Sequence, residues 1–133
     1  MQQTNLAARL GFEPGQVVQE IGYGDDIDHD LREGIESLVG QDLVDENYDD
    51  IADVVLRWFR DQDGDLTDAL VDAIGLLDED GIWLLTPRSG HDGYIEPGAI
   101  QDAAQTAGLS PTKSISVAPN WSGTRLSAPK SRR

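Results

Sequence analysis

A regular alternation of short apolar segments and helical stripes constrains the fold more than any other feature of this sequence. The apolar segments are typical of β-strands and occupy residues 16–21, 52–59 and 82–86. The segment 82–86, Ile-Trp-Leu-Leu-Thr, is the most hydrophobic stretch of the chain, so we expect it to form the central strand. A helical stripe follows each segment. Strands that alternate with helices indicate a parallel sheet with right-handed crossovers and helices on both faces.

The three helices are predicted from their apolar spacing and their end signals. One stripe at helical spacing is formed by Ile27, Leu31, Ile35 and Leu38. Asp25 and Asp26 offer an N-cap for this first helix, and Gly40 offers its end. The second helix is predicted over residues 66–77, and the third over residues 97–107 with a proline at its first position.

The chain ends in a predicted antiparallel hairpin. Its strands are expected over residues 112–118 and 123–128, joined by the turn 119–122. The fold class is therefore α/β, with three α/β/α layers and a mostly parallel sheet of about five strands. Three parts are expected: a flexible lead-in over residues 1–13, a single domain over 14–130, and a basic tail over 131–133.

The charge is strongly acidic and unevenly spread. The chain has 25 acidic and 10 basic residues, a net charge of −15. Residues 1–110 hold all 25 acids and five arginines, whereas residues 111–133 hold five basic residues and no acid. The acidic body repels phosphate backbones, so we expect no nucleic acid to bind it. The basic end is either a solvated tail or a contact for an anionic surface, on this body or on a partner.

Composition also bears on location and on chemistry. The chain has no cysteine, which excludes disulfides, thiolate catalysis and Cys-ligated zinc. No apolar run approaches the roughly 18 residues that a membrane span needs. The N-terminus, Met-Gln-Gln-Thr-Asn, lacks the basic and apolar regions of a signal peptide. We therefore expect a cytoplasmic protein that does not contact membranes.

The first strand and its turn resemble a known cofactor-binding motif. Residues 17–24 end in Glu20-Ile21-Gly22-Tyr23-Gly24, which is similar to the acid-x-Gly-x-Gly turn of S-adenosylmethionine-dependent methyltransferases. Residues 52–56 and 77–87 resemble the fourth and fifth strands of that superfamily. The resemblance implies a Rossmann-like fold and a weak S-adenosylmethionine site at Glu20, Gly22, Tyr23 and Gly24. The glycines suit a tight strand-to-helix turn because glycine reaches positive φ without penalty.

The chain departs from the methyltransferase pattern in one interval. Between Gly40 and Asp53 it has twelve residues, where the superfamily has two further strands, a helix and the acid that holds the ribose. The third glycine of a phosphate-binding G-x-G-x-x-G turn is also absent, and the turn carries the acid Asp26. The fold is therefore predicted to be a shortened methyltransferase-like one. Over about residues 6–130, the chain resembles more closely a small actinobacterial family of unknown function, through residues 8–12, 64–70 and 83–87.

Two acidic clusters invite a metal interpretation. Residues 61–65, Asp-Gln-Asp-Gly-Asp, resemble a calcium loop, but glycine does not stand at the sixth position. We expect them to form a turn in which Asp65 caps the next helix. Asp26, His29 and Asp30 could share one helix face, but metal binding would need a further ligand. We predict no metal site, and no catalytic residue, because no nucleophile–base arrangement is present.

Four residues are predicted to bind a protein partner. Arg88 and His91 follow the central strand, at the sheet edge where ligands of α/β proteins usually bind. Trp121 and Arg125 belong to the hairpin, and an exposed tryptophan beside an arginine is typical of interfaces. Trp121 could equally fold back over the core. We expect a non-enzymatic interaction or regulatory module; the alternative is a small-ligand module with a remnant adenosyl or nucleotide site at the two-glycine turn.

Overall fold

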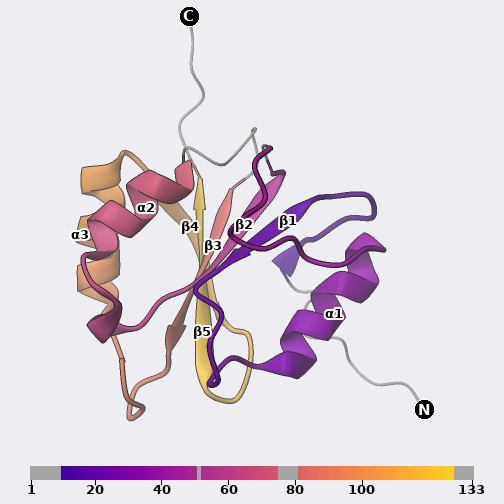
Figure 1. Ribbon diagram of the computed structural model, residues 1–133. Helices are drawn as coiled ribbons and strands as arrows, with labels where there is room; N and C mark the ends of the chain where they lie inside the picture. The colour runs from indigo at the N-terminus through magenta and orange to yellow at the C-terminus, as the bar shows by residue number, and fades with distance from the viewer. Residues whose placement is uncertain (1–9, 51, 75–80, 128–133) are drawn as a thin grey trace, which may run out of the picture.

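The computed structural model describes residues 10–50, 52–74 and 81–127 (Figure 1). The strands are β1 (Val18–Ile21), β2 (Val54–Trp58), β3 (Ile82–Pro87), β4 (Ser110–Ser116) and β5 (Trp121–Ser127). The helices are α1 (His29–Val39), α2 (Leu66–Ile74) and α3 (Pro97–Ala107), with a 3₁₀ turn η2 (Asp61–Asp63). The five strands form one sheet in the order β1-β2-β3-β5-β4. The predicted three-layer α/β fold with a C-terminal antiparallel hairpin is confirmed.

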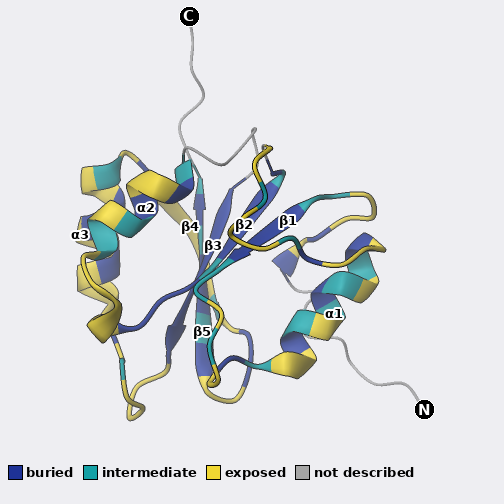
Figure 2. Cartoon of the chain, viewed as in Figure 1, coloured by how far each residue is buried: buried dark blue, intermediate teal, exposed yellow. Residues whose placement is uncertain are grey.

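The sheet separates two hydrophobic cores. Figure 1 shows α1 on one face and α2 with α3 on the other. β1, β2 and β3 are parallel, and β5 runs antiparallel to both β3 and β4. All six residues of β3 are buried, as Figure 2 shows by the dark blue middle of the sheet. The predicted central strand is therefore confirmed, because a strand covered on both faces needs apolar side chains on both sides.

The first helix starts later than predicted. Its N-cap is Asp28, whose carboxylate accepts a hydrogen bond from the Leu31 amide at 2.8 Å, not Asp25 or Asp26. Ile27 precedes the helix but is buried in the same core. Gly40 ends the helix in the left-handed region, as predicted. Residues 75–77, which were predicted to end the second helix, lie outside the described residues.

The expected lead-in is not loose over its whole length. Leu10 and Phe12 are buried in the core between α1 and the sheet. The indole Nε1 of Trp83 on β3 donates a hydrogen bond to the Leu10 carbonyl at 3.2 Å. Two buried apolar residues and one hydrogen bond thus suffice to dock this part of the segment on the sheet. Residues 1–9 and the tail 131–133 lie outside the described part of the chain.

The short interval after α1 covers the outer edge of β1. Val44 bridges Gln19 in parallel register: its amide donates to the Val18 carbonyl at 3.0 Å, and its carbonyl accepts from the Glu20 amide at 2.8 Å. The buried Gln19 side chain donates from Nε2 to the carbonyls of Asp45 and Tyr48. A few residues therefore occupy the place where a longer fold would add strands, and they satisfy the edge of the sheet.

The hairpin strands are shifted from their predicted limits. β4 begins two residues earlier than expected and β5 also begins two residues earlier, so that Trp121 belongs to β5 and not to the turn. A β-bulge lies between Pro111 and Lys113. β4 is exposed along nearly its whole length. Within the described residues, no helix is long and apolar enough to cross a membrane.

Candidate functional site

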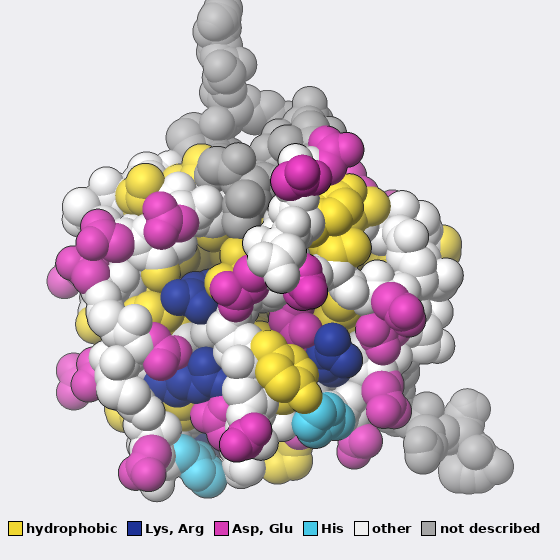
Figure 3. Space-filling model, in the orientation of Figure 1, with side chains coloured by type: hydrophobic (Ala, Val, Ile, Leu, Met, Phe, Trp, Pro, Cys, Tyr) yellow, Lys and Arg dark blue, Asp and Glu magenta, His cyan; other side chains and the backbone are white. Residues whose placement is uncertain are grey.

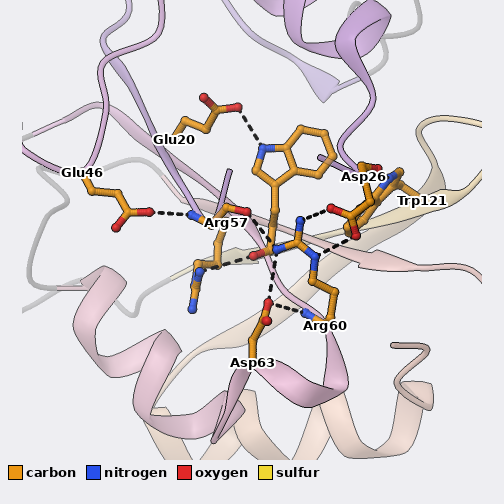
Figure 4. A network of polar contacts seen from close by, with 9 residues as sticks. Glu20, Asp26, Glu46, Arg57, Arg60, Asp63 and Trp121 are labelled. Carbon is orange, nitrogen blue, oxygen red and sulfur yellow. Dashed lines mark hydrogen bonds and ion pairs between the residues drawn. The ribbon is translucent and has the colours of Figure 1, made fainter. Parts of the chain in front are cut away.

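The candidate site lies where the carboxyl ends of β1, β2 and β3 meet, around the turn Gly22-Tyr23-Gly24. In open α/β sheets this edge is the usual place for ligands. Figure 4 shows the residues that converge there from β1, β2, η2, β5 and the interval after α1. Their polar groups form one network, described below from β1 outward.

Glu20 is buried and is bound by two neighbouring side chains. Its carboxylate accepts hydrogen bonds from Arg32 Nε, at 2.9 Å to each oxygen, and from the Trp58 indole at 2.9 Å. Only 4% of Glu20 is exposed. The hydrogen bond to Glu20 raises the pKa of Arg32, which favours the charged pair. Glu20, predicted as a cofactor ligand, therefore holds α1 and β2 to β1.

Gly22 is engaged through both of its backbone polar groups. Its amide donates to Glu46 Oε2 at 2.9 Å, and its carbonyl accepts from Arg60 Nη1 at 2.8 Å. Its φ is +89°, and a Cβ placed on it would lie 2.2 Å from the Trp58 carbonyl oxygen and 2.6 Å from Arg57 Nη1. A glycine is required here by the backbone conformation and by the close approach of β2.

Arg60 binds both sides of the turn. Its guanidinium forms a two-pronged ion pair with Asp26 and contacts Asp63 Oδ2 at 3.2 Å. The hydrogen bond between Arg60 and Asp26 raises the pKa of Arg60 and lowers the pKa of Asp26. Bidentate pairs of this kind fix geometry as well as charge. Asp26, the acid of this turn, thus has an arginine as its partner.

Trp121 folds back over the core, which was one of the two alternatives. It is 2% exposed, and its ring lies edge-on to Trp58 with centroids 4.9 Å apart. Its indole Nε1 donates to the Asp26 carbonyl at 3.0 Å, and the Arg60 guanidinium lies over its ring. Trp121 therefore belongs to the network and is buried, although it also lines a cavity of about 260 Å³ together with His91.

The structure divides the remaining predicted partner residues. Trp121 pairs with Pro87 at the carboxyl end of β3, whereas Arg125 pairs with Trp83 near its start. Four strand residues span about 13 Å, so Arg125 does not lie beside Trp121 as predicted. Arg88 and His91 are exposed near the Trp121 end, but they line two different cavities, of about 590 and 260 Å³. The predicted four-residue surface is therefore not one surface.

Basic side chains gather at this edge although the protein is acidic. Figure 3 shows separate dark blue patches near the middle of the face, with magenta acidic side chains between and around them. Arg32 lies 5.4 Å from the ring of Tyr23, which is 56% exposed. Arg57 lies over the ring of Phe59, and burial lowers its pKa. Arg57 and Arg88 form no salt bridge with a carboxylate among the described residues, whereas Arg32 and Arg60 do.

The two acidic clusters have structural partners. Asp65 accepts hydrogen bonds from the amides of Thr67 and Asp68, which confirms its predicted role at the start of α2. His29 packs its ring edge-on against Tyr23, and Asp26 is paired with Arg60. No group of three metal-binding side chains is found in residues 10–50, 52–74 and 81–127.

Several residues of the network were not predicted from the sequence, among them Glu46, Arg57 and Arg60. They come from segments 24 to 38 positions away from Gly22, and one sequence contains no information on such pairs. One signal was present. Arg57 and Arg60 close the second strand, and residues 1–110 hold only five arginines against 25 acids. Rare cations at the carboxyl end of a strand could have been assigned to this edge.

Comparisons with known proteins agree with this architecture. A family model described as "Protein of unknown function (DUF3052)" matches residues 7–130. An uncharacterized protein of Mycobacterium tuberculosis (strain H37Rv) is 51% identical over 130 residues, which cover 97% of this chain and 82% of that protein.

Two of the similar solved structures come from a methyltransferase complex and from a methyltransferase. A chain of the complex between the Haloferax volcanii Trm112 methyltransferase activator and the putative methyltransferase matches with a TM-score of 0.63 and 11% identity, covering 96% of this chain and 89% of that chain. Magnesium protoporphyrin IX methyltransferase from Synechocystis PCC 6803, with bound SAM, matches with a TM-score of 0.53 and 12% identity, covering 92% and 74%. At these identities the likeness shows the fold alone. The chain thus has a methyltransferase-like Rossmann-type fold, and it belongs to the DUF3052 family of proteins of unknown function.

Proposed function

We propose that this protein is a non-enzymatic interaction or regulatory module, built on a methyltransferase-like fold whose cofactor turn is closed by the chain itself. The observation that carries the proposal is the state of Gly22. Its amide and its carbonyl, the groups that a glycine turn exposes beneath a cofactor, are bound by Glu46 and Arg60. A turn whose backbone groups are hydrogen-bonded within the chain has a structural role.

The residues around the turn do not fit an adenosyl cofactor. Glu20, the acid of the motif, is bound by Arg32 and Trp58. The segment that would supply a ribose-binding acid is replaced by the interval around Val44, which caps the edge of β1. The space over Gly22 faces the Trp58 carbonyl and Arg57. The Glu20 carboxylate and both backbone groups of Gly22 thus have structural partners.

A role in protein binding draws support from the exposed loop after β3. Arg88 is exposed, and the one hydrogen bond of its guanidinium among the described residues goes to the Pro119 carbonyl at 3.3 Å. One structural relative of this protein is part of a complex with a methyltransferase activator, so this fold can support protein association. The proposal includes a cytoplasmic location for the module.

An amide NMR titration of labelled protein with S-adenosylmethionine and S-adenosylhomocysteine tests the closed turn. We expect no saturable shifts at Ile21–Asp26 at millimolar ligand, and the same result for the Arg125→Gln control. A genuine methyltransferase titrated in parallel shows that the ligands are active. Saturable shifts at the turn of the wild-type protein would overturn the proposal.

The second candidate function is a small-ligand module at the same turn. One observation favours it: Glu46 is exposed and reaches the turn through a single hydrogen bond to Gly22. A ligand carboxylate could replace such a contact. In the same titration, shifts that appear in Glu46→Ala but not in the wild type would support this candidate, because the variant frees the Gly22 amide.

A further inference from the structure

The outer strand β4 and the cavity beside it form a second surface, on the α3 side of the sheet. The cavity has a volume of about 590 Å³ and lies between α3, the loop after β3, and the strands β4 and β5. Figure 1 places β4 next to α3 at the end of the sheet, and Figure 2 shows exposed residues along it. This surface is separate from the Gly22 network.

The floor of the cavity is made of hydroxyl groups in two rows. Thr86, Ser122 and Ser116 stand opposite one another on β3, β5 and β4. Thr124 and Ser114 form the next row on the same face, because residues two apart in a strand point the same way. Such hydroxyls can both donate and accept hydrogen bonds, so the floor can bind a polar, extended ligand.

The backbone of β4 offers further hydrogen bonds beside this floor. The Val117 amide donates to the Trp121 carbonyl at 3.2 Å, next to the position where Ser116 stands opposite Ser122. The ladder alternates, so Ser116 and Ser114 occupy the positions whose N–H and C=O point away from β5. Within the described residues no further strand pairs with β4. By contrast, the opposite edge of the sheet is covered by Val44.

Charge selects the kind of segment that would fit. Among the described residues that line the cavity, Arg88 carries the only charge. Glu96, the residue before α3, and Asp102 on α3 are exposed and do not line it. The hairpin, residues 110–127, contains Lys113 and Arg125 and no acid. At physiological salt the Debye length is about 8 Å, so the acidic face around α1 is largely screened from this edge.

Resting on the function proposed above, we infer that an extended acidic segment of a partner protein adds to β4 as a strand. Its backbone pairs with Ser114 and Ser116, and an acidic side chain lies over the hydroxyl rows toward Arg88. Strand addition of this kind obtains affinity from the backbone and specificity from alternate side chains. The bulge and Lys113 at the start of β4 limit the pairing to its second half.

Blocked six-residue peptides test the inference directly. Each peptide has three valines that alternate with three polar residues. The three peptides differ only at the central polar residue, which is glutamate, glutamine or lysine. Amide NMR titration of the labelled wild-type protein should show saturable shifts at Arg88 and Ser114–Ser116. The glutamate peptide should bind most tightly and the lysine peptide most weakly. Arg88→Gln should weaken binding of the glutamate peptide about fivefold and remove the difference in affinity between the peptides.

Two variants separate the backbone contact from the charge. Ser116→Pro removes an outward N–H that β5 does not use, so it should weaken all three peptides. Arg125→Gln is the matched control, because Arg125 lies on the other face of the hairpin, and it should leave binding unchanged. Since Ser116→Pro could also unfold the hairpin, Arg88→Gln is decisive by itself.

Several results would overturn the inference. They are an absence of shifts with every peptide, tightest binding of the lysine peptide, or an equal loss in Arg125→Gln and Arg88→Gln. Shifts at Ser114–Ser116 that depend on protein concentration without peptide would assign the edge to a second copy of the chain and would also overturn it. The cofactor titration is independent of these results, so a failed peptide experiment leaves the proposed function standing.

Discussion

The carboxylate of Glu20 on β1 accepts a hydrogen bond of 2.9 Å from the indole of Trp58 on β2. Both residues are buried, and the same carboxylate also binds Arg32 on α1. One acid therefore joins two strands and a helix. Because charged groups are costly to bury without partners, each of the three side chains depends on the other two.

Removing this acid should destabilise the protein strongly. Glu20→Ala leaves the Trp58 indole without an acceptor and Arg32 without its ion pair, which should cost about 3 kcal/mol of unfolding free energy. Glu20→Gln keeps an acceptor oxygen and should cost clearly less. Urea denaturation at pH 7 measures both. A small loss in Glu20→Ala, equal to that of the exposed Glu46→Ala, would contradict the structural role of Glu20.

The ion pair between Asp26 and Arg60 should make stability depend on acidity. Arg60 lowers the pKa of Asp26 from its ordinary value of 3.8 in the folded protein. The ion pair thus contributes its full stabilisation of the folded protein above pH 3.8. This contribution is lost as the pH falls through the lowered pKa of Asp26. Asp26 is 56% exposed, so solvent screening limits the contribution to less than about 1 kcal/mol.

Comparison with Asp26→Asn isolates this contribution. Urea denaturation of both proteins at pH 7 and pH 3 should show a larger difference at pH 7. The two curves should converge at low pH, where the carboxyl group of the wild type is protonated. If the difference in unfolding free energy between the two proteins grew as the pH fell, the ionised Asp26 carboxylate would not stabilise the fold.

A side chain at Gly22 should destabilise the fold by about 2–4 kcal/mol, through positive φ and overlap with β2. The Cβ of Gly22→Ala would lie 2.2 Å from the Trp58 carbonyl oxygen. Gly40→Ala is the matched control, because Gly40 has a φ of +80° but no atom within 4 Å of an added Cβ. The difference between the two thermal unfolding free energies measures the overlap. Equal losses would mean that β2 can move away.

Truncating Trp121 should damage the core and not merely a surface. Trp121→Ala should cost about 3–5 kcal/mol, as for other buried aromatic residues. Trp121→Phe, which keeps an aromatic ring but loses the hydrogen bond to the Asp26 carbonyl, should cost less. Tyr23→Ala removes an exposed aromatic residue and should change stability by less than about 0.5 kcal/mol. Chemical denaturation that ranks Tyr23→Ala above Trp121→Ala would refute this.

The sheet could be predicted from the sequence because its inner strands are apolar on both faces. The start of α1 could not, since Asp25, Asp26, Asp28 and Asp30 are near-equivalent as caps and only the tertiary contact of Asp26 with Arg60 decides among them. The hairpin was placed two residues late because Trp121 was assigned to a turn. Its burial depends on Trp58, which is 63 positions earlier in the chain.

The position of the candidate site could be predicted from the sequence, but the contacts between its residues could not. The glycine turn at residues 22–24 was identified because its residue types are diagnostic of a tight turn. The partners of Gly22 were not, since Glu46 and Arg60 are ordinary charged residues until the fold brings them together. Arg125 was predicted to lie beside Trp121 because the two are close in sequence. Both belong to the extended strand β5, however, and they pair with residues four positions apart on β3.

The three tryptophans make the protein its own optical probe. Each indole nitrogen donates to a different part of the chain: Trp83 to Leu10, Trp58 to Glu20, and Trp121 to Asp26. Their fluorescence therefore reports on the N-terminal segment, the first strand and the segment that leads into α1. Single tryptophan-to-phenylalanine variants would separate the three signals. Coincident transitions would show that the shortened sheet unfolds as one cooperative unit, and staggered ones would show which of these three attachments opens first.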